Sequence, residues 1–375
     1  MTVTVGETAV RAGDRTLWVR SAAADPESPE YTNGHVLVPC VGEHPVYDAP
    51  MYDAMSGDEV RNRAYAEAVA RVAPGRTVVE IGPGKHALWS IAAVRAGARH
   101  VYAIEELPVY VELAREAIAA AGMSDRITVL TGHSTTVELP ERVDVCISEI
   151  IGCIGGSEGT ASVLDDVRRR YLKPGGTSVP LRCTTTVSAA TVDGLLPGDA
   201  PCLATETVPY VEAMYEAHGR AFDFRVCLYG DLGPVLLSGP SEVEDLRFDT
   251  GPVLAGRDRV TTTVSRPGLL TGLVLGIRLQ TADGVRVIDT LRDETSWLPV
   301  YAPLWTEGRQ VAAGDRIDID FAWEPSDDGV HPDYRITATL TTPDDVHVGE
   351  WVSPYRTGGP GASDFHRALV RETET

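Results

Sequence analysis

Residues Val78 to Glu105, VVEIGPGKHALWSIAAVRAGARHVYAIE, contain the clearest fold pattern in the chain. A short apolar run ends at Gly82, apolar residues then recur at helical spacing as far as Gly97, and a second apolar run ends at Glu105. A strand, a helix and a strand in this order predict two parallel strands joined by a helix that covers one face of a sheet.

The same alternation continues on both sides of this stretch. Helical spacing is found over 58–72, 109–122 and 160–172, and strand-like runs occupy 126–132 and 143–149. Asp58 is suited to cap the first of these helices, and KPGG at Lys173 predicts a turn after the last one. The pattern predicts an α/β protein whose Rossmann-like, parallel-sheet domain covers residues 46–181.

Beyond about Leu181 the pattern changes. Alternating or β-branched runs, separated by glycine, proline and aspartate turns, lie at 183–192, 272–280, 286–291, 316–323 and 335–342. They predict an antiparallel β-barrel or sandwich domain over 182–355, and a helical arm at about 206–219 favours a homodimer. Residues 1–45 are predicted to be a partly β N-terminal extension, and residues 356–375 a flexible tail.

The composition narrows the class of partner. A formal net charge of −21 argues against nucleic acid and anionic membrane as partners, and it favours a cationic substrate. The sequence has no signal peptide and no apolar run of the roughly 18 residues that a membrane helix needs, so we expect a cytoplasmic protein. The six cysteines form no CxxC pair and the nine histidines no HxxxH cluster, so the sequence predicts no metal site.

Ligands of an open parallel sheet bind beyond the carboxyl ends of its strands. Gly82 and Gly84 let the backbone turn toward such a ligand, and Glu105 is placed to accept the hydroxyl groups of a ribose. Because Gly82, Gly84 and Ala87 also match the GxGxxA dinucleotide fingerprint, a NAD-dependent oxidoreductase is an alternative. Glu80 favours S-adenosylmethionine (SAM), since an acid can organise the loop or meet a cationic amino group but would repel a pyrophosphate.

The segment Ser148 to Glu158, SEIIGCIGGSE, follows the last of the predicted parallel strands. Glu149 and Glu158 stand nine positions apart, with glycines and small apolar residues between them. A buried helix would lose roughly 1 kcal/mol for each glycine relative to alanine, and a solvated loop would be more polar. The segment is therefore expected to be built around a ligand.

Several segments in this order resemble the protein arginine methyltransferases: MSGDEVRNRAY, the stretch quoted first, LPERVDVCISEIIG with SEG after it, YLKPGGTSVP and ETSW. The resemblance runs from about Met55 to Val352 and is strongest over 55–182, and the paired glutamates are its most specific element. It implies a SAM-binding Rossmann-like domain followed by a β-barrel, often a dimer through a helical arm, and methyl transfer in the cleft between the domains.

Carried over by position, the resemblance implies a role for each matching residue. The cofactor would be held by Met55 beside the sulfonium, Arg61 on the carboxylate, Gly82 and Gly84 along the amino-acid portion, Glu105 on the ribose, and His133, Ser134 and Thr135 beside the adenine. Glu149 and Glu158 would grip the nucleophile. Two carboxylates can hold a guanidinium by charge-assisted hydrogen bonds while one nitrogen faces the methyl group.

Three departures from the family concern the acceptor. The aromatic YFxxY signature has no match, the bulky residues between the paired glutamates are replaced by glycines and small apolar residues, and the Thr-His-Trp loop reads Thr-Ser-Trp at 295–297. The residues expected to line the acceptor pocket are Tyr47, Tyr52, Ile150, Cys153, Ser296 and Trp297.

The missing histidine is expected to leave Asp58 without its partner and to remove a proton acceptor, and the glycines are expected to widen the pocket. Both changes predict a SAM-dependent methyltransferase that acts on a nitrogen, oxygen or carbon of a small molecule, as in natural-product tailoring. The alternative is an arginine N-methyltransferase acting on protein or free arginine. An oxidoreductase and a non-catalytic binding module are more distant alternatives.

Overall fold

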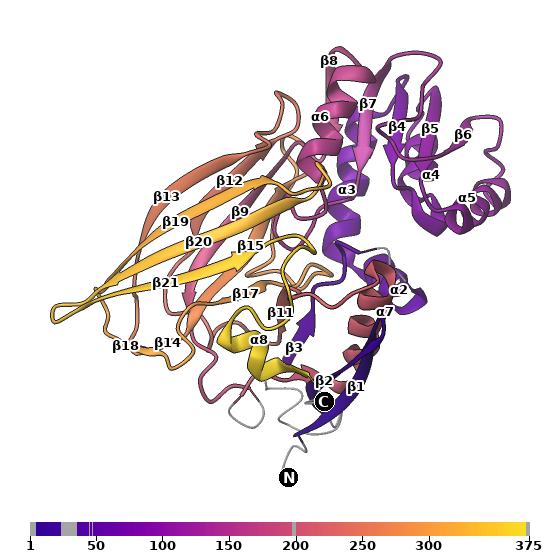
Figure 1. Ribbon diagram of the computed structural model, residues 1–375. Helices are drawn as coiled ribbons and strands as arrows, with labels where there is room; N and C mark the ends of the chain where they lie inside the picture. Colours follow the sequence, from indigo (N-terminus) through magenta and orange to yellow (C-terminus); the bar gives the residue numbers. More distant parts are fainter. Residues whose placement is uncertain (1–4, 24–35, 45, 47, 197–199, 373–375) are drawn as a thin grey trace.

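The computed structural model describes residues 5–23, 36–44, 46, 48–196 and 200–372 (Figure 1). An α/β part and a larger β part lie at opposite ends of the molecule, and the first strands of the chain lie with the β part (Figure 1). This is the α/β-plus-antiparallel architecture that the sequence predicts.

The α/β part contains a five-stranded sheet in the order β6-β5-β4-β7-β8, and all four pairings in it are parallel. Its strands are β4 (Thr77–Ile81), β5 (His100–Glu105), β6 (Ile127–Thr131), β7 (Val143–Ser148) and β8 (Leu172–Val179). Every residue of β4 is buried, as expected for a central strand with both faces covered. The strand order reverses at β4, and a ligand crevice is expected outside the carboxyl end of such a strand.

Helices lie against this sheet or, as α2 (Ala49–Gly57) does, away from it on the side of the β part (Figure 1). The others are α3 (Glu59–Val72), α4 (Leu88–Arg95), α5 (Pro108–Ala120) and α6 (Thr160–Arg170). Asp58 caps α3 as predicted, because its Oδ1 accepts a hydrogen bond from the amide of Arg61 at 2.8 Å. Helix α2 was not predicted, and Asp48 caps it by accepting from the amide of Met51 at 3.0 Å.

The predicted KPGG turn lies inside β8 rather than before a strand. Val143 pairs with Leu172 but Val145 pairs with Thr177, so β8 carries extra residues between two pairings with β7. Gly175 supplies the left-handed backbone, with φ of 76°, that this irregularity needs.

The β part contains an eleven-stranded sheet, a four-stranded sheet and a two-stranded ribbon. The large sheet is formed by β1 (Val5–Ala12), β2 (Arg15–Ala22), β3 (Val36–Pro39), β9 (Arg182–Ala190), β10 (Leu203–Ala204), β11 (Val226–Tyr229), β12 (Ser241–Arg247), β15 (Gly272–Gln280), β16 (Ile288–Asp289), β17 (Val300–Pro303) and β22 (Val370–Glu372). The others are formed by β13 (Gly256–Thr263), β19 (Arg316–Pro325), β20 (Pro332–Thr341) and β21 (Val346–Ser353), and by β14 (Gly268–Leu270) with β18 (Arg309–Val311). Leu275, Phe321 and Ile336 belong to one buried core that joins the large sheet to the four-stranded one.

The two ends of the chain meet on the large sheet. Residues 364–372 form α8 (Asp364–Leu369) and β22, and β22 pairs with β2, so this part of the predicted flexible tail is ordered. The sequence missed this because the pairing joins residues some 350 positions apart, as in Trp18 with Arg371. The predicted arm forms α7 (Val208–His218), which lies along β1 of the same chain (Figure 1).

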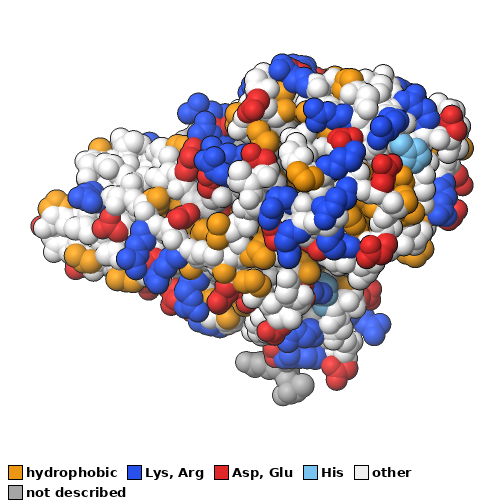
Figure 2. Space-filling model, turned by 90° about the horizontal axis from the view of Figure 1, so that it is seen from above, with side chains coloured by type: hydrophobic (Ala, Val, Ile, Leu, Met, Phe, Trp, Pro, Cys, Tyr) orange, Lys and Arg blue, Asp and Glu red, His pale blue; other side chains and the backbone are white. Residues whose placement is uncertain are grey.

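Surface charges of both signs are interspersed on the face seen in Figure 2. On α6, for example, Arg168 lies 2.8 Å from Asp165 and Arg170 lies 2.8 Å from Asp166. Among the described residues, no helix combines the length and apolar composition that crossing a membrane requires.

Candidate functional site

A cavity of about 620 Å³ lies at the carboxyl ends of β4, β5 and β7. The α/β part contributes residues 82–84, the glycine loop, together with the residues after β5 and β6 and both glutamates of the 149–158 segment. The segments 42–44, 328–331 and 355–356 contribute to the wall on the side of the β part. The cavity therefore lies where the two parts meet, as the resemblance implies.

The glycine loop has the backbone that the sequence predicts. Gly82 and Gly84 have φ of 69° and 57°, in the left-handed region that favours glycine. A Cβ atom on Gly84 would lie 3.0 Å from the ring of Tyr52, so a side chain there would push against that ring. Both glycines line the cavity.

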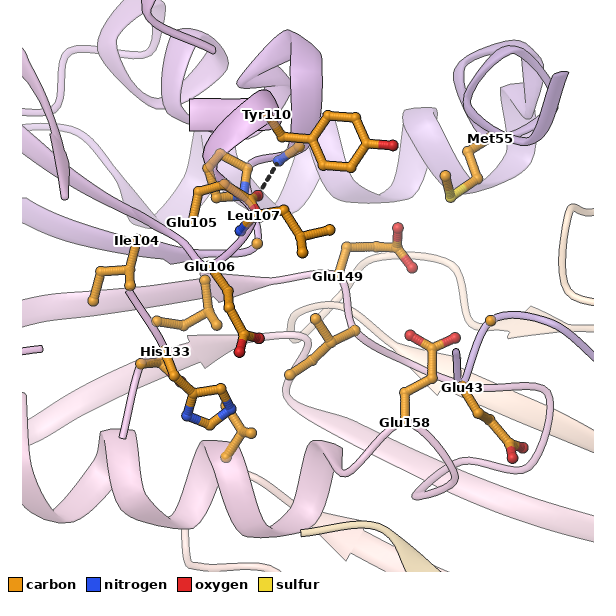
Figure 3. A pocket seen from close by; sticks show the side chains of 18 of the residues that line it. Glu43, Met55, Ile104, Glu105, Glu106, Leu107, Tyr110, His133, Glu149 and Glu158 are labelled. Atoms are coloured by element: carbon orange, nitrogen blue, oxygen red, sulfur yellow. Dashed lines mark hydrogen bonds between the residues drawn. The ribbon is translucent and has the colours of Figure 1, made fainter. Parts of the chain in front are cut away.

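Glu105 fixes this loop to the end of β5. Its Oε2 accepts a hydrogen bond from the amide of Gly84 at 3.1 Å, and its Oε1 accepts one from the amide of Leu107 at 3.0 Å (Figure 3). Burial raises the pKa of Glu105, although these two amides act in the opposite direction. Glu105 thus holds the loop and also lines the cavity.

Glu80 lies behind the glycine loop and is not among the cavity-lining residues. Its Oε2 accepts a hydrogen bond from the hydroxyl of Ser90 on α4, and burial raises its pKa to about 7. These contacts link Glu80 to the start of α4, which follows the glycine loop, rather than to the space that a cofactor would occupy.

Arg61 and Glu149 form an ion pair whose side chains are 7% and 11% exposed. The Nε of Arg61 is buried and has no hydrogen-bond partner among the described residues. Three aromatic rings surround the guanidinium, those of Tyr65, Trp89 and Trp297, at 5.9, 5.6 and 6.0 Å from the ring centroids. A buried cation with an orphan donor at the cavity wall is suited to an anionic group such as the carboxylate of SAM.

The two glutamates of the 149–158 segment lie on the same side of the cavity. Figure 3 shows their carboxylates turned toward one shared space, and Met55 extends toward it from α2. Burial raises the pKa of Glu149, whereas the Arg61 guanidinium acts to lower it. Glu158 directly precedes Gly159, which is the N-cap residue of α6 and has a left-handed conformation with φ of 76°.

The glycines between the glutamates do not widen the cavity, contrary to the prediction, because none of them lines it. A Cβ on Gly155 would lie 2.9 Å from the sulfur of Cys183 on β9, and one on Gly156 would lie 2.9 Å from the Glu244 carboxylate on β12. The segment carries glycines because it packs tightly against two strands of the β part.

Asp58 keeps a partner despite the missing histidine, so that prediction was wrong. Its Oδ2 accepts hydrogen bonds from the amide and the hydroxyl of Ser296, at 2.7 and 3.0 Å. The serine amide and hydroxyl therefore tie α3 to the 295–297 loop. Trp297 of the same loop donates from its Nε1 to the carbonyl of Ile151 at 2.7 Å. This bond also fixes residues 149–158, the double-glutamate segment.

The remaining predicted residues divide into two groups. Those that line the cavity are Tyr52, Met55, His133, Ser134 and Ile150. Those among the described residues that do not are Thr135, Cys153, Ser296 and Trp297, and Tyr47 lies outside the described residues. Thr135 is exposed, and its hydroxyl lies 2.6 Å from Nδ1 of His133. Thr135 therefore contacts a cavity-lining residue without lining the cavity itself.

One wall of the cavity was missed altogether. His331 stacks on Tyr355 with ring centroids 4.0 Å apart, and the Arg356 guanidinium lies 4.2 Å from the centre of the same tyrosine ring. Asp328 Oδ2 joins them, at 2.7 Å from His331 Nδ1 and 3.0 Å from Arg356. Arg356 has the left-handed φ of 56°, unusual for a residue with a side chain. No sequence motif marks this cluster.

Comparisons of the sequence and of the fold with known proteins both find methyltransferases. Residues 65–177 match the family model "Ribosomal protein L11 methyltransferase (PrmA)". The arginine N(omega)-methyltransferase of Streptomyces achromogenes subsp. streptozoticus is 40% identical over 281 residues, which cover 72% of this chain and 75% of that protein. The probable protein arginine N-methyltransferase 6 of Arabidopsis thaliana is 36% identical over 137 residues, which cover 36% of this chain and only 31% of that protein.

Two solved structures share the fold. Protein arginine methyltransferase 10 of Arabidopsis thaliana superposes with a TM-score of 0.65 at 19% identity, covering 81% of this chain and 98% of that one. The Trypanosoma brucei PRMT1 enzyme-prozyme heterotetrameric complex with AdoHcy gives 0.67 at 17% identity, covering 82% of this chain and 99% of that one. 

These relatives favour the arginine alternative over the predicted natural-product type of acceptor. The 40% identity to the Streptomyces protein extends over three quarters of its length, well beyond the cofactor-binding region. The chain therefore belongs to the arginine N-methyltransferase family and is a SAM-dependent methyltransferase.

Proposed function

We propose that this protein transfers a methyl group from SAM to a guanidinium nitrogen of arginine, and that the acceptor is the free amino acid. The observation that carries the proposal is the pair of carboxylates, Glu149 and Glu158, that line one cavity together with the glycine loop and Glu105. A guanidinium is the planar cation that two carboxylates hold best.

The cofactor would be held by the wall of the cavity that belongs to the α/β part. Gly82 and Gly84 allow the backbone to approach its amino-acid portion, Glu105 would accept the ribose hydroxyls, and Arg61 would bind the carboxylate. Met55, His133 and Ser134 line the same cavity and would contact the sulfonium and the adenine. SAM bound there supplies a methyl group on a positively charged sulfur.

The two glutamates would position the acceptor and take up its proton. A guanidinium nitrogen that gains a methyl group must lose one proton to keep the product singly charged. Glu149 is suited to accept this proton on a carboxylate oxygen, because burial raises its pKa while Arg61 keeps the side chain oriented. Glu158 would then keep the guanidinium in place through a charge-assisted hydrogen bond.

Free arginine is favoured by three observations. The Streptomyces relative, whose match covers 72% of this chain, is named for arginine, whereas the Arabidopsis relative named for protein arginine matches over 137 residues only. The net charge of −21 attracts a small cation. Arg356 and His331 line the cavity on the side of the β part, where they could meet the carboxylate of an amino acid.

The proposal is tested by incubating the protein with SAM that carries a deuterated methyl group. Free arginine and an arginine-containing peptide are supplied together, and the products are separated and weighed by mass spectrometry. We expect one deuterated methyl group on arginine, placed on a guanidino nitrogen by fragmentation. Methylation of the peptide alone would contradict the free amino acid as acceptor. Methylation of neither would overturn the arginine proposal.

Homodimer formation and a cytoplasmic location stay predictions. The domain boundaries after residues 45, 181 and 355 are also proposed. The N-terminal strands β1 to β3 and the C-terminal strand β22 nevertheless belong to the large sheet of the β part. Analytical ultracentrifugation of the full chain tests the dimer.

A further inference from the structure

Three cysteines that are far apart in the sequence meet beside the double-glutamate segment. Cys40 follows β3, Cys153 lies between Glu149 and Glu158, and Cys227 lies on β11. Their sulfur atoms all lie within 4.8 Å of one another. Cys40 and Cys227 are 3% and 2% exposed, and Cys153 is partly buried.

The backbone fixes two of these cysteines firmly. Strands β3 and β11 pair in an antiparallel ladder in which Cys227 lies opposite Val38. The amide of Cys40 donates to the carbonyl of Arg225 at 2.8 Å, which extends the ladder by one bond. Cys153 approaches from the double-glutamate segment, so the three sulfurs join two elements of the β part to the segment that lines the cavity.

The spacing of the three sulfurs suits a thiophilic cation. A tetrahedral Zn²⁺ has zinc–sulfur bonds of about 2.3 Å, which places its sulfur ligands roughly 3.8 Å apart. Sulfurs within 4.8 Å of one another need only small side-chain rotations to reach this geometry.

Glu43 is the candidate for a fourth ligand, although its carboxylate is not among the atoms that all lie within 4.8 Å of one another. Its Oε1 lies 3.7 Å from the sulfur of Cys40, and Figure 3 shows its carboxylate pointing away from Glu158. Arg225 donates to the same Oε1 at 2.6 Å, and the two side chains are only 3% and 4% exposed. Arg225 is itself held by Ser353 at 2.7 Å, so a buried cation orients the carboxylate and would offset the charge of metal-bound thiolates.

We propose that Cys40, Cys153 and Cys227 bind one Zn²⁺, with Glu43 as the fourth ligand. The ion would anchor the double-glutamate segment to β3 and β11 without touching the reacting atoms. This is a structural site, and it rests on the sulfur cluster rather than on the identity of the acceptor. The sequence contains no zinc motif because the ligands come from three separate segments that only the fold brings together.

The direct test measures metal in the full-length protein. Elemental analysis of protein purified without chelator is expected to give one zinc per chain. After chelation, Co²⁺ should restore the site and produce both thiolate-to-cobalt charge-transfer absorption and the visible bands of a tetrahedral ion. Cys153→Ser should weaken Zn²⁺ binding by about 100-fold or more, at or beyond the upper end of the effect of losing a supporting partner.

Cys202→Ser is the control, because Cys202 is also a cysteine shielded from solvent, at 1% exposed, but is none of the three clustered positions. It should keep full zinc content and the cobalt spectrum. If Cys153→Ser does not fold, the wild-type titration with Co²⁺ still decides the question. Reduced wild-type protein that binds neither ion, or a Cys153→Ser variant with unchanged affinity, would overturn the proposal. Isolation of a disulfide among the three cysteines or of bound Cu⁺ would overturn the zinc assignment.

Discussion

The two walls of the cavity are built in different ways. The wall on the α/β side comes mainly from one continuous stretch between residues 81 and 163, where strand ends and backbone turns place each group. The opposite wall comes from segments 42–44, 328–331 and 355–356, and stacked rings and ion pairs hold it together. The difference suggests that local backbone geometry sets cofactor binding, whereas long-range packing sets acceptor choice.

The double-glutamate segment joins the two walls. Glu149 is held by Arg61 of the α/β part, and the glycines after it pack on β9 and β12 of the β part. Substitutions on the first wall should therefore change SAM affinity, those on the second wall should change acceptor affinity, and those on this segment should change the rate of transfer.

The largest effect is expected for Glu158→Gln. Loss of one charge that positions the acceptor should lower kcat by about 100-fold or more, comparable to the loss of one preorganised electrostatic contact in other enzymes. The affinity for SAM, measured by calorimetry, should change by less than about 3-fold, a difference below 1 kcal/mol. Glu116→Gln on the exposed face of α5 is the control. A Glu158→Gln enzyme with normal kcat would remove the segment from catalysis.

Glu105→Ala should affect the wall on the α/β side, and therefore SAM affinity. It removes the acceptor of the Gly84 and Leu107 amides as well as the proposed ribose contact, so SAM binding should weaken by about 1 to 3 kcal/mol. The KM for arginine should stay near its wild-type value. Glu105→Gln, which retains one acceptor oxygen, should show a smaller loss. An unchanged SAM affinity for Glu105→Ala would exclude a cofactor contact.

Arg356→Gly should affect acceptor binding only. Glycine tolerates the φ of 56° at this position, so the substitution removes the guanidinium without straining the backbone. We expect the KM for free arginine to rise about 10-fold, equivalent to one charged hydrogen bond, with kcat and SAM affinity unchanged. Arg356→Lys keeps the charge and should recover part of the affinity. Equal KM values for all three proteins would show that this wall does not contact the amino acid.

The smallest expected effect is on the pH dependence of folding stability, through Glu244, whose carboxylate lies against Gly156 of the double-glutamate segment. Burial raises the pKa of Glu244 to about 7, against an ordinary value of 4.5, although the hydroxyls of Thr185 and Tyr334 oppose the shift. Between these two pH values the folded protein holds a proton that the unfolded chain has released, so stability should fall as pH rises.

Glu244→Gln should remove this dependence. Between pH 4.5 and about 7, the slope of the free energy of unfolding against pH should become smaller by about 1 kcal/mol per pH unit. Denaturant titrations from pH 5 to pH 7 measure it. Glu242→Gln, at a half-exposed position of the same strand, serves as the comparison and should leave the slope unchanged. Identical slopes for Glu244→Gln and wild type would contradict a raised pKa.

The sequence predicted what depends on neighbours along the chain. The alternation around Gly82, the cap at Asp58 and the acid at Glu105 are local features, and the structure has them in the expected elements. The function of the glycines at 155 and 156 was misjudged because their steric partners, Cys183 and Glu244, lie tens of residues away.

Other errors have the same physical origin. Ser296 replaces a histidine but uses its backbone amide to reach Asp58, a contact that side-chain identity does not reveal. Tyr355 and His331 come together only through the pairing of β20 and β21 near them, and neither belongs to a recognisable motif. Long-range strand pairing therefore determines the part of the site that the sequence could not predict.

The most direct test is a crystal structure of the protein with S-adenosylhomocysteine and arginine. We predict the nucleoside beside Gly84 and Glu105, and the arginine guanidinium hydrogen-bonded to both Glu149 and Glu158. A complex in which the guanidinium binds elsewhere, or in which either glutamate faces solvent while arginine is bound, would show that the two glutamates do not hold the acceptor.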